Sequence, residues 1–134
     1  LARTLPQWLA GTITPQEQNH AAATFTKKLT KEDGHLNWNE PAEIILRKIH
    51  ALNPWPGTFV FWNGRRLKII EARVIRAAKS GMPAGMVVKS GSGLAVACND
   101  GAVFIELLQL EGKKIMPSAE FAKGYRDVIG AKLT

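Results

Sequence analysis

The sequence predicts a mainly β protein with flanking helices, an α+β fold built on a small antiparallel barrel or sheet. Three observations lead to this expectation. Five short apolar stretches lie between residues 58 and 108, Gly-rich tight turns connect several of them, and helical periodicity precedes and follows them. Strands at such close spacing, joined by hairpin turns, are typical of small antiparallel sheets and barrels.

The first part of the chain predicts an arm. Residues 1–11 indicate a short helix ending at Gly11, a residue suited to a helix C-cap. Residues 12–23 are polar and aperiodic, which favours an extended linker. Phe25 and Leu29 are apolar, and we expect them to hold this linker against the folded part.

A helix is expected from Pro41 to about Leu52. Asn39 or Glu40 can cap it, and Pro41 suits its first turn because the missing N–H is not needed there. The apolar residues recur at helical spacing and predict one buried face, made of Ala42, Ile45, Ile49 and Leu52.

Trp55 follows this helix and stands between Pro54 and Pro56. A residue that precedes proline is pushed toward extended geometry, so Trp55 is held in a rigid corner. Because large aromatic side chains contribute most by burial, we expect Trp55 to seal one end of the core. The alternative, that Trp55 contacts a ligand, stays open.

The first hairpin is expected to start with a strand over Thr58–Trp62. Asn63-Gly64 has the composition of a two-residue type I′ turn. The return strand runs from Arg66 to about Arg76, and its apolar register shifts by one residue near Ile69-Ile70. A one-residue shift in a period-two pattern indicates a β-bulge.

Residues 79–85 predict a loop, and three further strands are expected over residues 86–88, 94–98 and 103–108. The turns between these strands are Ser90–Gly93 and Asn99–Gly101. After the last strand, Ser118 is expected to cap a final helix that runs toward Val128.

The charge of the chain is strongly positive. Among 134 residues, 18 are basic and 11 acidic, a net charge of +7. Residues 47–89 hold most of the excess in nine basic side chains, with one acid, Glu71. They are Arg47, Lys48, Arg65, Arg66, Lys68, Arg73, Arg76, Lys79 and Lys89. Such a stripe is typical of a protein that binds a phosphate backbone, and a basic surface that only aids solubility is the alternative.

The sequence has no evident catalytic or metal-binding motif. His20, His35 and His50 are fifteen residues apart, which is not the spacing of a metal site. Cys98 lies in a run of small and apolar residues, which predicts a buried thiol. Residues 90–93 lack the lysine of a phosphate loop and precede a strand. We therefore expect no catalytic residue, no metal ligand and no cofactor in this chain.

Other classes are excluded by length and composition. No apolar run approaches the ~20 residues of a membrane span, and the first residues do not resemble a secretory leader. One cysteine excludes an internal disulfide and fits a reducing compartment. The chain does not begin with Met, and we expect it to be a piece of a longer protein.

Several motifs occur in order along nearly the whole chain and resemble those of one family. They are Thr4-Leu5-Pro6, Gly11 through Gln16, Ala23-Thr24-Phe25, Lys28 through Asp33, Asn37-Trp38 with Pro41-Ala42, Asn53 through Gly57, Gln109 through Lys114 with Met116, and Phe121 through Gly124. On these residues the chain resembles the C-terminal domain of the methionyl-tRNA formyltransferase family, with the linker that precedes it.

This resemblance implies an open antiparallel β-barrel similar to an OB-fold. It divides the chain into residues 1–36, the end of a catalytic-domain helix plus a linker arm, and residues 37–134, the barrel domain. In the family, the full-length enzyme transfers a formyl group from 10-formyltetrahydrofolate to initiator methionyl-tRNA. The formyl-transfer residues lie in an N-terminal catalytic domain that this chain does not contain.

The implied partners are initiator methionyl-tRNA and that N-terminal domain, with no membrane, in a cytoplasmic monomer. Seven cations are expected to contact tRNA: Lys28 and Lys31 on the arm, Arg65, Arg66 and Lys68 at the first hairpin, and Lys113 and Lys114 in the later loop. Two alternatives stay open. One is the matching domain of a related enzyme, a 10-formyltetrahydrofolate hydrolase or dehydrogenase or a sugar-nucleotide formyltransferase. The other is a non-catalytic interaction module.

Overall fold

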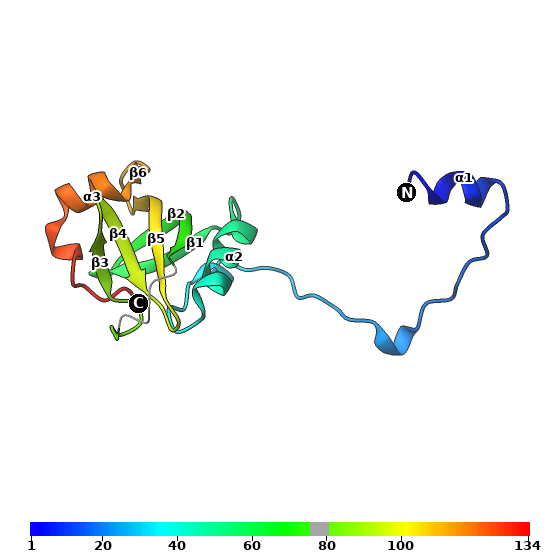
Figure 1. Ribbon diagram of the computed structural model, residues 1–134, viewed down its shortest axis with the longest axis horizontal. Helices are drawn as coiled ribbons and strands as arrows, with labels where there is room; N and C mark the ends of the chain where they lie inside the picture. The colour runs from blue at the N-terminus through cyan, green and yellow to red at the C-terminus, as the bar shows by residue number, and fades with distance from the viewer. Residues whose placement is uncertain (76–80) are drawn as a thin grey trace.

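An arm extends away from the rest of the chain in the computed structural model, which describes residues 1–75 and 81–134 (Figure 1). The arm carries helix α1 (Thr4–Leu9) and the 3-10 turn His20–Ala22, joined by residues without regular structure. Phe25 is 94% exposed, so the expectation that it holds the linker in place is wrong. Few apolar contacts are available here because the side chains around Phe25 are themselves exposed.

The arm joins the domain next to a second 3-10 turn, Glu32–Gly34. His35 forms a parallel bridge with Phe59, and the Leu36 N–H donates to the Phe59 carbonyl at 3.0 Å. A Cβ at Gly34 would lie only 2.0 Å from the Gly57 carbonyl oxygen. Glycine is therefore required where the arm passes this backbone.

Helix α2 (Ala42–Leu52) buries the face that its periodicity predicts. The expected cap is wrong, because no side chain of the N-terminal flank caps the helix. The Ala42 N–H instead donates to Asp100 Oδ1 at 2.8 Å, across 58 residues of sequence. Asn39 and Glu40 make other contacts. Asn39 donates to the Asn37 side chain at 3.0 Å, and Glu40 pairs with Lys48 at 2.6 Å.

Trp55 is 57% exposed, so the expectation of a buried plug is wrong. The Gly57 N–H donates to the Leu52 carbonyl at 2.8 Å, which folds residues 53–56 back at the end of α2 and leaves the indole outside. The buried tryptophans are Trp38 and Trp62, each 4% exposed.

The sheet is antiparallel throughout its named strands, as expected. The strands are β1 (Thr58–Trp62), β2 (Arg65–Ile75), β3 (Val87–Ser90), β4 (Gly93–Ala97), β5 (Ala102–Leu110) and β6 (Met116–Pro117). Their order is β1-β2-β5-β4-β3, with β6 on β5. Strand β6 was not expected, because two residues including a proline leave no pattern in the sequence. The predicted strand end at Arg76 and the basic residue Lys79 lie outside the described residues.

Both local predictions for the first hairpin are confirmed. Asn63 and Gly64 have φ values of 49° and 74°, as a type I′ turn requires. The pairing of β2 with β5 shifts register between Ile69 and Glu71, which places the bulge where the apolar pattern slips. The bulge lets both halves of this long strand turn apolar side chains to the core.

The end of the chain connects the two edge strands. The Thr134 N–H donates to the Phe61 carbonyl in β1 at 3.1 Å. The Val87 N–H in β3 donates to the Ala131 carbonyl at 2.9 Å, and Met86 bridges Lys132. One short segment thus satisfies backbone groups on both edges of an otherwise open sheet.

The two helices of the domain lie on opposite sides of the strands in Figure 1, whereas α1 lies on the arm. Helix α2 packs on β1, β2 and β5, and α3 (Ser118–Gly124) packs on β4, β5 and β6. Helix α3 ends before the expected limit, and a 3-10 turn (Arg126–Val128) follows it.

Ser118 begins α3 but does not cap it, contrary to expectation. Its hydroxyl is buried, donates to the Ile105 carbonyl and accepts from the Leu94 N–H at 3.3 Å. The side chain therefore ties α3 to β4 and β5 instead of satisfying its own helix.

Candidate nucleic-acid interface

Five of the seven predicted cations come from two neighbouring segments. Arg65, Arg66 and Lys68 lie at the start of β2, and Lys113 and Lys114 follow β5. Because β2 pairs with β5 and Lys68 stands opposite Gln109, the loop after β5 lies beside the β1–β2 hairpin. We call these five residues the hairpin–loop surface.

Aromatic rings hold the Arg66 side chain in place. Its guanidinium carbon lies 4.2 Å from the centroid of the Phe59 ring and 6.0 Å from that of Phe61. Phe61 stands directly opposite Arg66 across β1 and β2, so the strand register places the stack. Such cation–π contacts contribute about 0.5–1 kcal/mol at partly exposed sites. The stack orients the guanidinium without neutralising its charge.

Hydrogen bonds join the loop to the hairpin. Arg65 Nη2 donates to the Glu111 carbonyl at 2.7 Å, and the Arg66 N–H donates to Glu111 Oε2 at 3.2 Å. Gln109 Nε2 donates to the Lys113 carbonyl at 2.9 Å. Gly112, with φ +74°, makes the turn. The hairpin and the loop that carry the two groups of cations are therefore fixed relative to each other.

A cavity of about 250 Å³ opens in this surface, lined by Arg66, Lys68, Gln109, Glu111 and Gly112. Within the described residues, Arg66, Lys68, Lys113 and Lys114 have no carboxylate ion-pair partner. A guanidinium and an ammonium beside an open cavity form a suitable site for a phosphate group.

Lys28 and Lys31 are not part of the hairpin–loop surface, since both lie on the arm. The neighbouring Lys27 pairs with Asp33 at 2.6 Å, and the Thr30 N–H donates to the same carboxylate at 2.8 Å. The hydrogen bonds from Lys27 and Thr30 lower the pKa of Asp33 to about 2. Asp33 thus organises the turn at the base of the arm.

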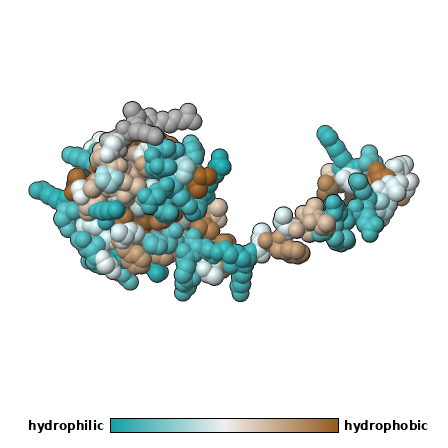
Figure 2. Space-filling model, turned by 90° about the horizontal axis from the view of Figure 1, so that it is seen from below, coloured by the Kyte–Doolittle hydropathy of each residue, from teal (hydrophilic) through white to brown (hydrophobic). Residues whose placement is uncertain are grey.

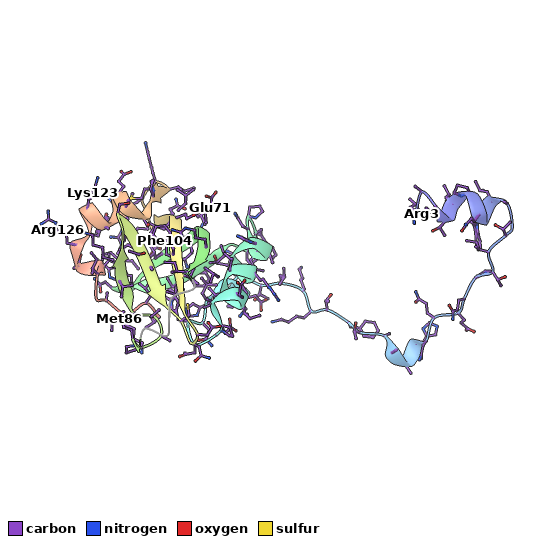
Figure 3. The ribbon with its side chains drawn as sticks, in the orientation of Figure 1. Arg3, Glu71, Met86, Phe104, Lys123 and Arg126 are labelled. Atoms are coloured by element: carbon purple, nitrogen blue, oxygen red, sulfur yellow. The ribbon has the colours of Figure 1, made fainter. Side chains whose placement is uncertain are left out.

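The basic stripe predicted from the sequence is not one surface. Lys48 is paired with Glu40, and Arg73 lies 3.3 Å from Glu106 and over the Phe104 ring. Lys89 lines a separate cavity of about 540 Å³ with Lys123 and Arg126, which Figure 3 shows on α3 and the turn after it. Lys123 and Arg126 were not predicted because they lie outside the basic run.

On the face shown in Figure 2, hydrophilic side chains cover most of the domain, and hydrophobic atoms appear as separate spots. The far end of the arm differs, since Leu5, Trp8 and Leu9 of α1 are all more than half exposed.

The described residues hold no group of three His, Cys, Asp or Glu side chains that could bind a metal ion. Cys98 is buried, and burial raises the pKa of its thiol to about 12. This thiol is therefore protonated at neutral pH and is a poor nucleophile. Over residues 1–75 and 81–134, the helices are too short or too polar to cross a membrane.

Comparison with known proteins places the fold in a family. The family model described as "Formyl transferase, C-terminal domain" matches residues 28–126. A methionyl-tRNA formyltransferase of Roseiflexus castenholzii is 44% identical over 133 residues, which cover 99% of this chain and 42% of that protein. The corresponding protein of Geotalea daltonii is 38% identical over 133 residues, again 99% of this chain and 42% of the relative.

A solved structure shares the fold. HypX from Aquifex aeolicus superimposes with a TM-score of 0.62 at 20% identity, covering 96% of this chain and 23% of HypX. The chain spans less than half the length of the curated methionyl-tRNA formyltransferases that it matches.

Proposed function

The chain belongs to the formyl transferase C-terminal domain family, and on that basis we propose that it is the tRNA-binding part of a methionyl-tRNA formyltransferase. The relatives that match it at 38–44% identity carry that name. The observation that carries the proposal is the hairpin–loop surface, whose two segments are joined by hydrogen bonds and whose Arg66 and Lys68 line an open cavity.

This surface suits the phosphate backbone of folded RNA. Arginine and lysine bind phosphates by charge, and the release of counterions supplies much of the binding free energy. The major groove of A-form RNA is too deep and narrow for side chains to read, so such contacts recognise shape and backbone. The surface therefore positions tRNA and does not read its sequence.

The full-length enzyme transfers a formyl group from 10-formyltetrahydrofolate to the methionyl amino group of initiator tRNA, in the cytoplasm and as a monomer. Catalysis and folate binding belong to the N-terminal domain. Residues 1–36 form the linker from that domain, and residues 37–134 form the domain that binds tRNA. In the full-length enzyme the exposed apolar side chains of α1 then pack against the catalytic domain.

The arm extends the tRNA-binding surface. Lys28 and Lys31 have no ion-pair partner within the described part of the chain, and both precede the point where the arm joins the domain. They contact phosphates of the tRNA backbone that lie between the two domains.

The barrel domain is of the open, OB-like kind. Support comes from residues 131–134, whose backbone bonds to β1 and β3 connect the two edges of the sheet. OB-folds commonly bind oligonucleotides, which agrees with the proposed role but is a fold analogy.

The isolated chain is expected to have no formyltransferase activity, because it brings no catalytic residue. The check is to incubate it with formyl donor and charged initiator tRNA. Turnover above background would contradict the division of labour between the domains.

A titration with tRNA tests the binding function. Fluorescence anisotropy with labelled initiator and elongator tRNAs at low salt should show weak binding of both, with strong salt dependence and little selectivity. A sugar-nucleotide or folate enzyme does not need a basic surface for its substrate. Absence of binding at low salt would therefore favour such an enzyme or an interaction module.

A further inference from the structure

A third cavity, of about 410 Å³, lies where the start of the domain meets its end. It is lined by residues 35–39 and 132–134 together with Ala84. Both walls are fixed by backbone bonds. The Leu36 N–H donates to the Phe59 carbonyl at 3.0 Å, and the Leu133 N–H donates to the Gly85 carbonyl at 2.9 Å.

One lining residue carries a buried donor without a partner. Trp38 is 4% exposed, and its indole Nε1 has no hydrogen-bond acceptor in the structure. Nearly all buried polar groups in native proteins are satisfied by protein, water or ligand, so each exception calls for an explanation. Trp62 Nε1 is also unpartnered, but Trp62 does not line this cavity and packs against Phe121 and Tyr125.

Several side chains around the cavity can donate hydrogen bonds. The Asn37 oxygen already accepts from the Asn39 N–H at 3.1 Å and the Asn39 amide at 3.0 Å, which leaves the Asn37 amide nitrogen to donate. Lys132 adds an ammonium without an ion-pair partner in the described chain, and His35 adds an imidazole. Acceptors come from the Asn39 side chain and from Thr134, whose backbone oxygen already binds the Phe61 N–H at 2.6 Å. The side chains of Asp and Glu are absent from the lining.

The Phe59 ring lies between the cavity and the hairpin–loop surface. His35 stacks on Phe59, with ring centroids 5.2 Å apart and planes at 7°, and Arg66 lies over the same Phe59 ring at 4.2 Å. Phe59 thus connects the cavity residue His35 to the predicted RNA-binding cation Arg66.

From these observations we propose that this cavity binds a phosphate group of the RNA backbone, held by Asn37, Trp38 and Lys132. A phosphate offers several acceptor oxygens and negative charge to a set of donors that includes a cation. The cavity is larger than one phosphate, so there is also space for part of the adjoining sugar. The inference rests on the proposed function for the source of the phosphate, since free phosphate has the same chemistry.

Indole N–H signals in ¹⁵N-NMR spectra of the whole chain test the proposal. Addition of tRNA at low salt should shift the Trp38 signal downfield and leave that of Trp62 in place. Lys132→Met should remove that shift and reduce the log–log salt slope by about 0.9, the loss of one phosphate contact. Lys123→Met is the matched control, because it removes the same charge from α3 and should keep the Trp38 shift.

The outcomes separate the two proposals. If tRNA binds and the Trp38 signal does not move, or Trp38 and Trp62 move alike, the cavity is not a phosphate site and the proposed function stands. If tRNA does not bind but inorganic phosphate shifts Trp38 in a Lys132-dependent way, the site holds for free phosphate and the proposed function falls. If neither tRNA nor inorganic phosphate has an effect, both proposals are overturned.

Discussion

Removal of two cations from the hairpin–loop surface tests how this protein holds RNA. In the double variant Arg66→Ala/Lys68→Ala, the cavity between the hairpin and the loop loses the two cations that line it. Arg66 is held on Phe59 and not by a carboxylate, so its charge is available to a phosphate. We expect weaker binding of every tRNA to a similar degree, because contacts to phosphate carry no sequence information.

The expected change in the salt dependence of binding follows from the number of cations removed. If each of the five residues neutralises one phosphate, the hairpin–loop surface contributes about −4.5 to the slope of log K against log salt, and the double variant reduces this contribution to about −2.7. Between 50 and 200 mM salt this surface should then account for about a 500-fold loss of affinity in the unaltered chain and about a 40-fold loss in the variant. Anisotropy titrations at four or five salt concentrations measure both slopes.

The matched control is Lys123→Ala/Arg126→Ala. Both double variants lower the net charge of +7 by two, but Lys123 and Arg126 line a different cavity. The control should keep most of the original slope. Equal slopes for the two double variants would refute the reasoning, because they would show that binding follows net charge and not the hairpin–loop surface. Thermal melting checks that the loss of the Arg66 stack, about 0.5–1 kcal/mol, has not unfolded the domain.

Three further predictions concern stability and the arm. Trp55→Ala should change the free energy of unfolding by less than about 1 kcal/mol, whereas Trp62→Ala should cost about 3–5 kcal/mol, as urea denaturation can show. Asp100→Ala should cost about 1 kcal/mol because the Ala42 N–H loses its acceptor, and an unchanged denaturation midpoint would contradict the cap across the fold. The pKa of Asp33 is lowered from 3.8 to about 2. The ion pair and hydrogen bonds of Asp33 should therefore stabilise the arm turn fully above about pH 3.8, and this stabilisation should be lost as the pH falls through 2. NMR titration of the Asp33 carboxyl measures this directly, and a midpoint near 3.8 would mean that the turn does not form.

Much of the fold was predictable because its signals are local. The Asn63-Gly64 turn follows from the φ values those residues tolerate, and the bulge near Ile70 follows from a slip in a period-two pattern. The buried face of α2 follows from helical spacing alone. The resemblance to a family, carried by short motifs in order, likewise needed only the sequence and is confirmed by the family match.

The candidate site was predictable only in part. The sequence identified the cations of the hairpin and of the later loop, but their meeting depends on the pairing of β2 with β5. The stack of Arg66 on Phe59 depends on the register between β1 and β2. The cavity lined by residues 35–39 and 132–134 joins residues about a hundred positions apart, and no local pattern signals such a meeting.

Tertiary structure decided which side chains are inside and what they bind. In the sequence Trp38 stands between two asparagines and Trp55 between two prolines, yet Trp38 is buried and Trp55 is exposed. Asp100 caps a helix 58 residues away, and Ser118 ties α3 to two strands. The local sequence determines which backbone conformation a segment prefers, because steric contacts act between near neighbours. Burial and hydrogen-bond partners depend instead on which distant segments pack together, and that is set only when the whole sheet and its helices form.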